Sequence, residues 1–176
     1  MPAPDAPWGA PARIAPPGVA NERSALAAFL DYHRATFLTK CAGLDGEQLA
    51  RQSCPPSSLS LLGLLRHLCD VERSWLRRSL DGQVAPPLFH TTDGNRDDQF
   101  DLVDPDRAAD VLAVYRAEVD SSREIAARHE LTETVTTRHG DVVSVRWILL
   151  HLIEEYSRHN GHADLLREAI DGVRGE

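Results

Sequence analysis

The stretch from Val145 to Ala169 constrains the fold most, because its apolar residues recur every three or four positions. Residues with this spacing share one face of a helix that packs against others. The predicted inward face carries Val145, Ile148, Leu152, Glu155, His159, His162, Leu166 and Ala169. Its two ends are apolar, but its middle holds a carboxylate and two imidazoles. A buried carboxylate is costly unless it is paired or bound to a metal, so this face calls for a partner.

Glu155 and His159 are four residues apart, which stacks them one helical turn apart on the same face. A helix offers two ligands to one cation in this way. His67 lies near the middle of a second apolar helical stretch and is the candidate third ligand. Two imidazoles and one carboxylate would leave coordination positions open, which is typical of a catalytic site. We therefore predict a metal site at His67, Glu155 and His159 that activates a thiol or water nucleophile, with the nucleophile on the metal and no other catalytic group assigned.

Other interpretations of these residues stay open. Glu155 could form a buried salt bridge to Arg34 or Arg123, or it could face water. The adjacent Glu154 lies about 100° away around the helix and is predicted to face outward, with His151 and Arg158. On the remaining inward faces, His33 and His162 are predicted to line the pocket or to support the ligands, since metal-bound groups need hydrogen-bond partners of their own.

The periodicity predicts an all-α fold, a four-helix bundle with long crossover connections and a small β-hairpin before the last helix. The expected helices run from Asn21 or Ser24 to Gly43, from Ser58 or Ser60 to just before Gly82, from Asp104-Pro105 through Ala126, and from Ser144 to Gly172. A shorter helical piece begins at Asp45. On the second long helix, the charged residues Asp70, Glu72, Arg73, Arg77 and Arg78 are expected mostly on the outer side. The segment from Gly82 to Asp104 has no clear period and is expected to act as a cover.

The chain has 176 residues, of which 42% are hydrophobic, and this suits one globular domain. We expect a flexible, Pro- and Ala-rich N-terminal arm over residues 1–19 and a bundle domain over residues 20–176. The net charge of −8 argues against nucleic acid and anionic membranes as partners. Three cysteines without a CxxC pair suit a reducing compartment, and no apolar run could span a membrane. These features predict a cytoplasmic protein.

Two motifs carry a family resemblance. The first is Leu65-Arg-His67-Leu-Cys-Asp-Val-Glu-Arg-Ser-Trp75, and the second is His151-Leu-Ile-Glu-Glu155-Tyr-Ser-Arg-His159-Asn-Gly-His162-Ala-Asp-Leu-Leu166. Together they resemble the DinB/YfiT-like superfamily, and more narrowly its DUF664 branch. Many members of that superfamily supply the last two metal ligands as His-x-x-x-His. Glu155 takes the first of these positions here, which is similar to the N-terminal domain of mycothiol-dependent maleylpyruvate isomerase and favours a harder cation.

The resemblance implies a homodimeric four-helix bundle with a divalent metal, of which zinc or nickel is expected, held by His67, Glu155 and His159. It also implies a small-molecule substrate and a low-molecular-weight thiol such as mycothiol as cosubstrate. The function expected on this basis is thiol transfer or isomerisation. Two alternatives remain: a non-catalytic helical dimer that binds metal or a small ligand in a stress response, and a bundle whose polar inward face is only a salt-bridge network.

Overall fold

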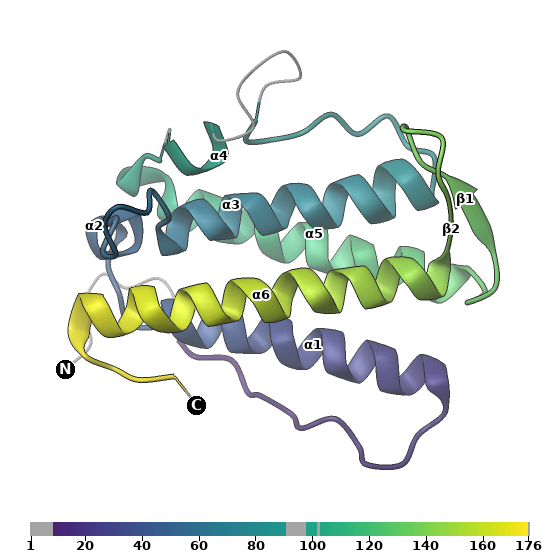
Figure 1. Cartoon of the computed structure of the whole chain (residues 1–176), viewed down its shortest axis with the longest axis horizontal. Coiled ribbons are helices and arrows are strands. Elements are labelled where there is room, and N and C mark those ends of the chain that lie inside the picture. The colour runs from purple at the N-terminus through teal and green to yellow at the C-terminus, as the bar shows by residue number, and fades with distance from the viewer. Residues whose placement is uncertain (1–8, 91–97, 102, 176) are drawn as a thin grey trace.

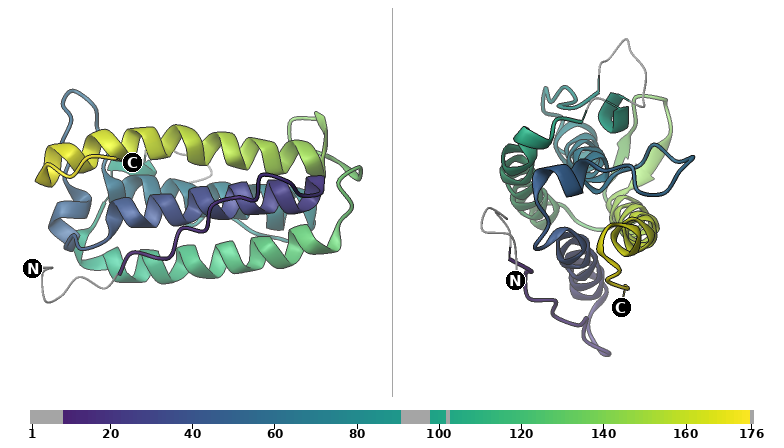
Figure 2. Two further views of the ribbon diagram at one scale, coloured as in Figure 1. Left: turned by 90° about the horizontal axis from the view of Figure 1, so that it is seen from below. Right: turned by 90° about the vertical axis from the view of Figure 1, so that its left-hand side faces the viewer.

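Four long helices pack side by side in a computed structural model that describes residues 9–90, 98–101 and 103–175 (Figure 1). Seen end-on, the helices occupy the four corners of a bundle (Figure 2). The helices are α1 (Glu22–Cys41), α2 (Gly46–Ala50), α3 (Leu61–Glu72) with its extension η1 (Arg73–Leu80), α4 (Asp98–Asp101), η2 (Pro105–Arg107), α5 (Ala108–Arg128) and α6 (Val145–Asp171). The predicted four-helix bundle is confirmed.

Short polar side chains begin the helices where the sequence predicted it. Asn21, Asp45, Ser60 and Ser144 each accept a hydrogen bond from a backbone N–H of the first turn that follows. These N–H groups have no partner within the helix, so each such cap stabilises the helix start. Gly172 ends α6 with a φ of 79°, a left-handed conformation that glycine adopts without a steric penalty.

The predicted hairpin is also confirmed, and it is tied to the start of the last helix. Strands β1 (Thr134–Thr136) and β2 (Val142–Ser144) pair antiparallel, with Val135 opposite Val143. The backbone N–H of Val145 donates to the carbonyl of Glu133 at 2.9 Å. The hairpin therefore lies against one end of the bundle, close to η1 (Figure 1).

The second long helix differs from its prediction in its last part. We expected one continuous α-helix, but Arg73–Leu80 forms a π-helix, in which the backbone N–H of Asp81 reaches the carbonyl of Leu76 at 2.9 Å. A π-helix turns less per residue than an α-helix and so changes which side chains face which neighbour. Arg73 and Arg77 both bind the Glu118 carboxylate on α5, at 2.7 and 2.8 Å.

A buried polar network joins the four long helices at mid-length. Arg34 of α1 donates two hydrogen bonds of 2.8 Å to the Glu72 carboxylate at the end of α3. The Tyr156 hydroxyl of α6 donates to the same carboxylate at 2.9 Å and lies 2.9 Å from the Tyr115 hydroxyl of α5. The Glu72 side chain is 0% exposed, so the expectation that it lies on the outer side of its helix is wrong. The reason is that the two hydrogen bonds and the opposite charge of Arg34 offset the free energy lost when the Glu72 carboxylate leaves water.

Asp70 was expected on the outer side as well, and it is buried too. Its carboxylate accepts hydrogen bonds from the backbone N–H groups of Leu88 and Phe89, at 2.7 and 3.0 Å, and contacts His90 Nδ1 at 3.0 Å. These bonds fasten the first part of the long connection along α3. Farther along, α4 packs on α3 at Gly63, where a Cβ atom would lie 3.3 Å from the Cα of Phe100. The rest of the connection, residues 91–97 and 102, lies outside the described residues.

The described part of the N-terminal arm, residues 9–20, runs without helix or strand along the outside of α1 (Figure 2). Pro11, Ala12 and Ile14 line a hollow of about 410 Å³ between α1 and α5. Arg13 lies 5.5 Å above the centre of the Tyr32 ring. The flexibility predicted for residues 1–19 stays a prediction, and residues 1–8 lie outside the described residues.

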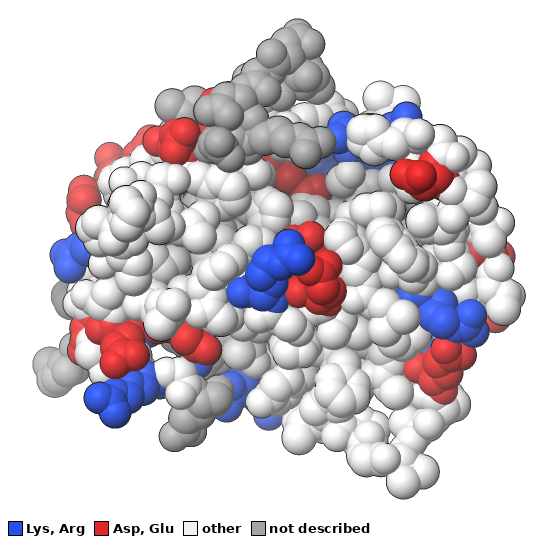
Figure 3. All heavy atoms as spheres, viewed as in Figure 1, with Lys and Arg blue, Asp and Glu red and all other residues white. Residues whose placement is uncertain are grey.

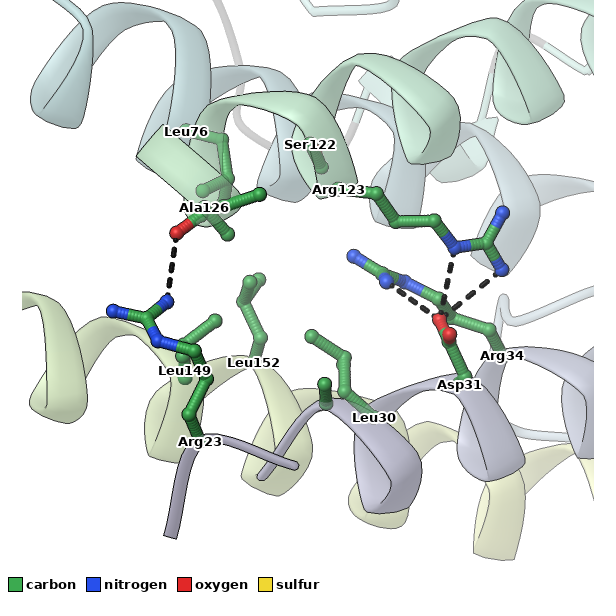
Figure 4. Close-up of a pocket in the computed structure, with 12 residues that line it drawn as sticks. Arg23, Leu30, Asp31, Arg34, Leu76, Ser122, Arg123, Ala126, Leu149 and Leu152 are labelled. Atoms are coloured by element: carbon green, nitrogen blue, oxygen red, sulfur yellow. Dashed lines mark hydrogen bonds and ion pairs between the residues drawn. The ribbon is translucent and has the colours of Figure 1, made fainter. Parts of the chain in front are cut away.

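A second hollow of about 160 Å³ lies between α1, α5 and α6 (Figure 4). Its walls are mostly apolar, with Leu30, Leu149 and Leu152 among them. Arg23 bridges one end to the carbonyl of Ala126, and ion pairs of Asp31 with arginines bridge the other. The three candidate metal ligands do not line this hollow.

The charged surface is divided into small groups. On the face formed by α3 and α6, acidic and basic atoms form separate small patches among mostly uncharged atoms (Figure 3). The net charge of −8 is therefore not concentrated in one acidic field on this face. In the part of the chain that the structure describes, no helix has both the length and the apolar character needed to cross a bilayer.

Replacing Glu72 with glutamine should destabilise the bundle by about 3–5 kcal/mol, because the change leaves the buried Arg34 charge without its partner. Urea unfolding followed by circular dichroism measures this loss. The matched control is Glu22→Gln, which removes the exposed partner of Arg146 and should change stability little. Equal effects of the two substitutions would contradict a structural role for the buried pair.

Candidate metal centre

The three predicted ligands converge between α3 and α6. His67 Nε2 lies 3.4 Å from Glu155 Oε2, and His159 Nε2 lies 3.4 Å from the same oxygen. The two imidazole ring centres are 4.6 Å apart. The side chains of His67, Glu155 and His159 are 20%, 14% and 10% exposed, so the group sits at the edge of the core and not in open solvent. His67 lies 88 positions before Glu155 in the chain, whereas Glu155 and His159 are neighbours on α6, four residues apart.

The spacing of the donor atoms fits a metal ion. Ligand atoms that each lie about 2.0–2.1 Å from a tetrahedral cation are roughly 3.3–3.4 Å apart. Both nitrogen-to-oxygen distances match this value, and one potential ligand atom from each residue lies within 4.8 Å of the others. Two imidazoles and a carboxylate also suit a borderline cation such as zinc or nickel. The residues therefore fit the group that the sequence predicted.

The surroundings of Glu155 and His159 favour the protonation states in which a carboxylate and an imidazole bind a metal ion. Hydrogen bonds from His159 and His67 hold the pKa of the Glu155 carboxyl well below its usual range, so this group is ionised at neutral pH. Burial lowers the pKa of His159, which favours the neutral imidazole. An ionised carboxylate beside neutral imidazoles is the state in which these side chains bind a cation.

The salt-bridge alternatives for Glu155 do not hold. Arg34 binds Glu72 and Asp31, and Arg123 binds Asp31 and Asp120. Among the described residues, the ion-pair partners of Glu155 are three histidines: His67, His159 and His151. The polar face of α6 is therefore not a network of fixed opposite charges.

Glu155 also belongs to a second possible ligand group, with His151 and Glu154. As predicted, Glu154 is exposed, and it forms an ion pair with the exposed Arg158. His151 departs from the prediction. It is half-buried, stacks on Trp147 with ring centres 5.0 Å apart, and lies 3.6 Å from Glu155 Oε1 through its Nε2. The group with His67 and His159 is the better candidate, because its members are more buried and lack a competing arginine.

His162 and His33 lie in different surroundings. His162 Nδ1 is 3.3 Å from His159 Nδ1, the ring nitrogen that faces away from Glu155. Metal-bound histidines usually donate their second N–H to such a partner, so this geometry suits the predicted supporting role. His33 instead contacts Ser157 Oγ at 3.2 Å and Asn160 Nδ2 at 3.4 Å. Its hydrogen bonds to described residues do not include the three candidate ligands, and its predicted role stays a prediction.

A pocket of about 240 Å³ opens beside His67. Its walls come from α3, η1, the hairpin and the long connection; the lining residues are His67, Asp70, Val71, Ser74, Trp75, Arg78, His90, Gln99 and Arg138. Phe100 of α4 packs near His67, with ring centres 5.5 Å apart. The described part of the long connection thus lies over one side of the site, as expected for this segment. A small molecule in this pocket would lie next to the cluster.

Several residues of this region were not predicted from the sequence. Glu72 recurs with Leu65, Leu68 and Leu76 at three- and four-residue steps, and this periodicity could have revealed that it is buried. No such signal was available for Arg78 and Arg138, because the pocket that they share forms only when the hairpin folds against η1.

Helical bundles build metal and cofactor sites from side chains on facing helices, and this cluster has that arrangement with open positions beside a pocket. The comparison with protein families gives the particular class. Residues 25–172 match the family model described as Mycothiol-S-transferase, and the chain belongs to this family. The family implies an enzyme that transfers mycothiol to an acceptor substrate. No curated protein matches the chain significantly.

Purified protein loaded with zinc should bind about one ion per chain, and His67→Ala or Glu155→Gln should abolish this binding, because each removes one of only three ligands. His162→Ala should weaken it by about 10–100-fold. Equilibrium dialysis with elemental analysis measures the stoichiometry. The matched control is Glu154→Gln on the same helix, which should keep the ion. Loss of the ion in Glu154→Gln with retention in His67→Ala would favour the second ligand group.

Zinc affinity should fall as the solution is acidified, because protons then compete with the ion for the imidazole nitrogens. The lowered pKa of Glu155 keeps its carboxylate ionised in mildly acidic solution, so it does not limit binding. A competing chelator at pH 5–8 measures the affinity. An affinity that does not change over this pH range would contradict ligation by the imidazoles.

Proposed function

We propose that this chain is a metal-dependent mycothiol S-transferase in which His67, Glu155 and His159 hold a divalent cation. The observation that supports the proposal is the convergence of three ligand atoms, with nitrogen-to-oxygen distances of 3.4 Å, at the edge of a pocket in a chain of this family. A divalent cation held there would lower the pKa of a thiol that approaches it and so produce a nucleophile near neutral pH.

The chain's own cysteines do not supply the nucleophile. Cys41 and Cys69 are fully buried, and burial raises the pKa of the Cys41 thiol to about 12 and that of Cys69 well above its usual value. Cys54 lies elsewhere, with its Sγ 3.5 Å from the carbonyl of Leu165. The thiol nucleophile of the proposed reaction is therefore assigned to a cosubstrate and not to the chain itself.

The cluster's residues have separate tasks in this proposal. Glu155 brings one negative charge and touches both imidazoles, which orients them toward a common point. His162 supports His159 from behind. The pocket beside His67 receives the electrophile, and Trp75 forms part of its wall. In the reaction, the thiol loses its proton to solvent and its sulfur forms a C–S bond to the electrophilic carbon, while the bond from that carbon to its leaving group breaks and the leaving group takes the bonding electrons.

The arrangement of Glu155 and the two histidines also bears on the expected subfamily and on the expected metal ion. A Glu-x-x-x-His pair at Glu155 and His159 supports a likeness to the maleylpyruvate isomerase branch, and the two histidines support zinc or nickel as the ion. The DUF664 assignment, the homodimer and the cytoplasmic location remain predictions from the sequence.

Zinc- or nickel-loaded protein should catalyse transfer of mycothiol to a model electrophile, and Glu155→Gln or His159→Ala should reduce turnover by more than about 100-fold. Product formation by mass spectrometry measures the activity, with glutathione and N-acetylcysteine testing the choice of thiol. Glu154→Gln serves as the control and should stay active. Stoichiometric metal binding with no turnover of any electrophile would instead favour the non-catalytic binding module, and turnover unaffected by His67→Ala would contradict the metal site.

A further inference from the structure

The pocket beside His67 contains two arginines from separate parts of the chain. Arg78 lies on η1, and Arg138 lies on the turn between β1 and β2, which folds against that end of the bundle (Figure 1). Both line the same hollow of about 240 Å³ as the candidate ligand His67. The hairpin thus brings a second positive charge to the entrance of the candidate active site.

Among the described residues, neither guanidinium forms an ion pair with a carboxylate. Arg78 donates to the hydroxyl of Ser74, and Arg138 Nε donates to His139 Nε2 at 3.0 Å. Their neighbours on η1 behave differently, because Arg73 and Arg77 share the Glu118 carboxylate. Burial and the nearby charge of Arg138 lower the pKa of the Arg78 guanidinium by more than the Asp70 carboxylate raises it, so Arg78 and Arg138 repel each other. An anion between them would relieve this repulsion.

The carboxylate that lines this pocket is already engaged. Asp70 accepts backbone hydrogen bonds from Leu88 and Phe89 and contacts His90, and its remaining effect on Arg78 is a longer-range attraction without a direct ion pair. The chain as a whole carries a net charge of −8 and would repel an acidic small molecule. A local pair of arginines would overcome this repulsion and also orient the molecule.

We propose that Arg78 and Arg138 bind the carboxylate of a small anionic electrophile, whose reactive carbon then lies toward His67. The inference rests on the proposed thiol transfer and adds the class of acceptor: a carboxylate-bearing electrophile small enough for this pocket. Trp75 offers an aromatic wall, and its ring contacts His151 with centres 4.9 Å apart. Such a wall suits a flat, conjugated or aromatic acid.

A matched pair of chromogenic probes tests this selectivity. The acid is 4-chloro-3,5-dinitrobenzoate, and the control is its neutral methyl ester. With either probe, the mycothiol sulfur forms a C–S bond at the chlorinated carbon, the C–Cl bond breaks, chloride leaves with the bonding electrons, and the thiol proton goes to solvent. After subtraction of the uncatalysed reaction, the enzyme should show a kcat/KM for the acid that exceeds that for the ester on the order of 10-fold.

Arg78→Gln and Arg138→Gln should each remove most of this preference, so that kcat/KM for the acid falls toward the value for the ester, while the KM for mycothiol changes little. Arg116→Gln is the matched control. It removes the same charge from an exposed arginine of α5 that lines a different hollow, and the preference for the acid should survive. Arg138 is exposed on the hairpin, so Arg138→Gln provides the test even if Arg78→Gln fails to fold.

A binding measurement separates this inference from the proposed function. Calorimetry with 3,5-dinitrobenzoate, which has no leaving group, should show binding to metal-free protein that Arg78→Gln and Arg138→Gln weaken on the order of 10-fold and Arg116→Gln does not. If neither probe is turned over but this pattern holds, thiol transfer fails and the anion site stands. Two kinetic results would count against the inference: equal kcat/KM for acid and ester, or variants that shift only the KM for mycothiol. Either result, together with dinitrobenzoate binding that the variants do not change, would overturn it.

Discussion

The buried pair of Arg34 and Glu72 is the interaction on which the rest of the bundle depends. A fully buried carboxylate is tolerated only with a partner, and this one receives two hydrogen bonds from α1 and a third from Tyr156 of α6. Although burial by itself would lower the pKa of Arg34, the Glu72 carboxylate raises it. Because Tyr156 directly follows Glu155 in the chain, the network also fixes the rotation of α6 and turns the face with Glu155 and His159 toward α3.

Glu72 and Glu155 illustrate two ways of keeping a carboxylate away from water. Glu72 is neutralised by a guanidinium, which keeps its charge at any pH that proteins meet. Glu155 lies among imidazoles, whose ring nitrogens can bind either a proton or a metal ion. The pair at Glu72 serves the structure, whereas the group at Glu155 can release protons and bind a metal ion. This difference is why the candidate chemistry is assigned to Glu155 and not to the more deeply buried Glu72.

Much of the fold could be predicted because helical periodicity is a local property. The alternation of three- and four-residue steps gave the four long helices, and short polar residues such as Asn21 and Ser144 marked where they begin. The same pattern selected Glu155 and His159, which lie on one turn of one helix. The π-helix at Arg73–Leu80 was missed, since the apolar spacing does not separate it from an α-helix. The burial of Asp70 was missed because its hydrogen-bond partners approach from the long connection.

The sequence by itself determined the helices, their inward faces and the identity of three candidate ligands, because spacing along a helix dictates which side chains share a face. Only the tertiary structure decided that His67 lies within reach of Glu155 and that His33 turns toward Ser157 and Asn160. It alone decided, too, that Arg78 and Arg138 share one pocket. Distances between separate elements depend on how the helices and the hairpin pack, and local periodicity carries no information about that packing.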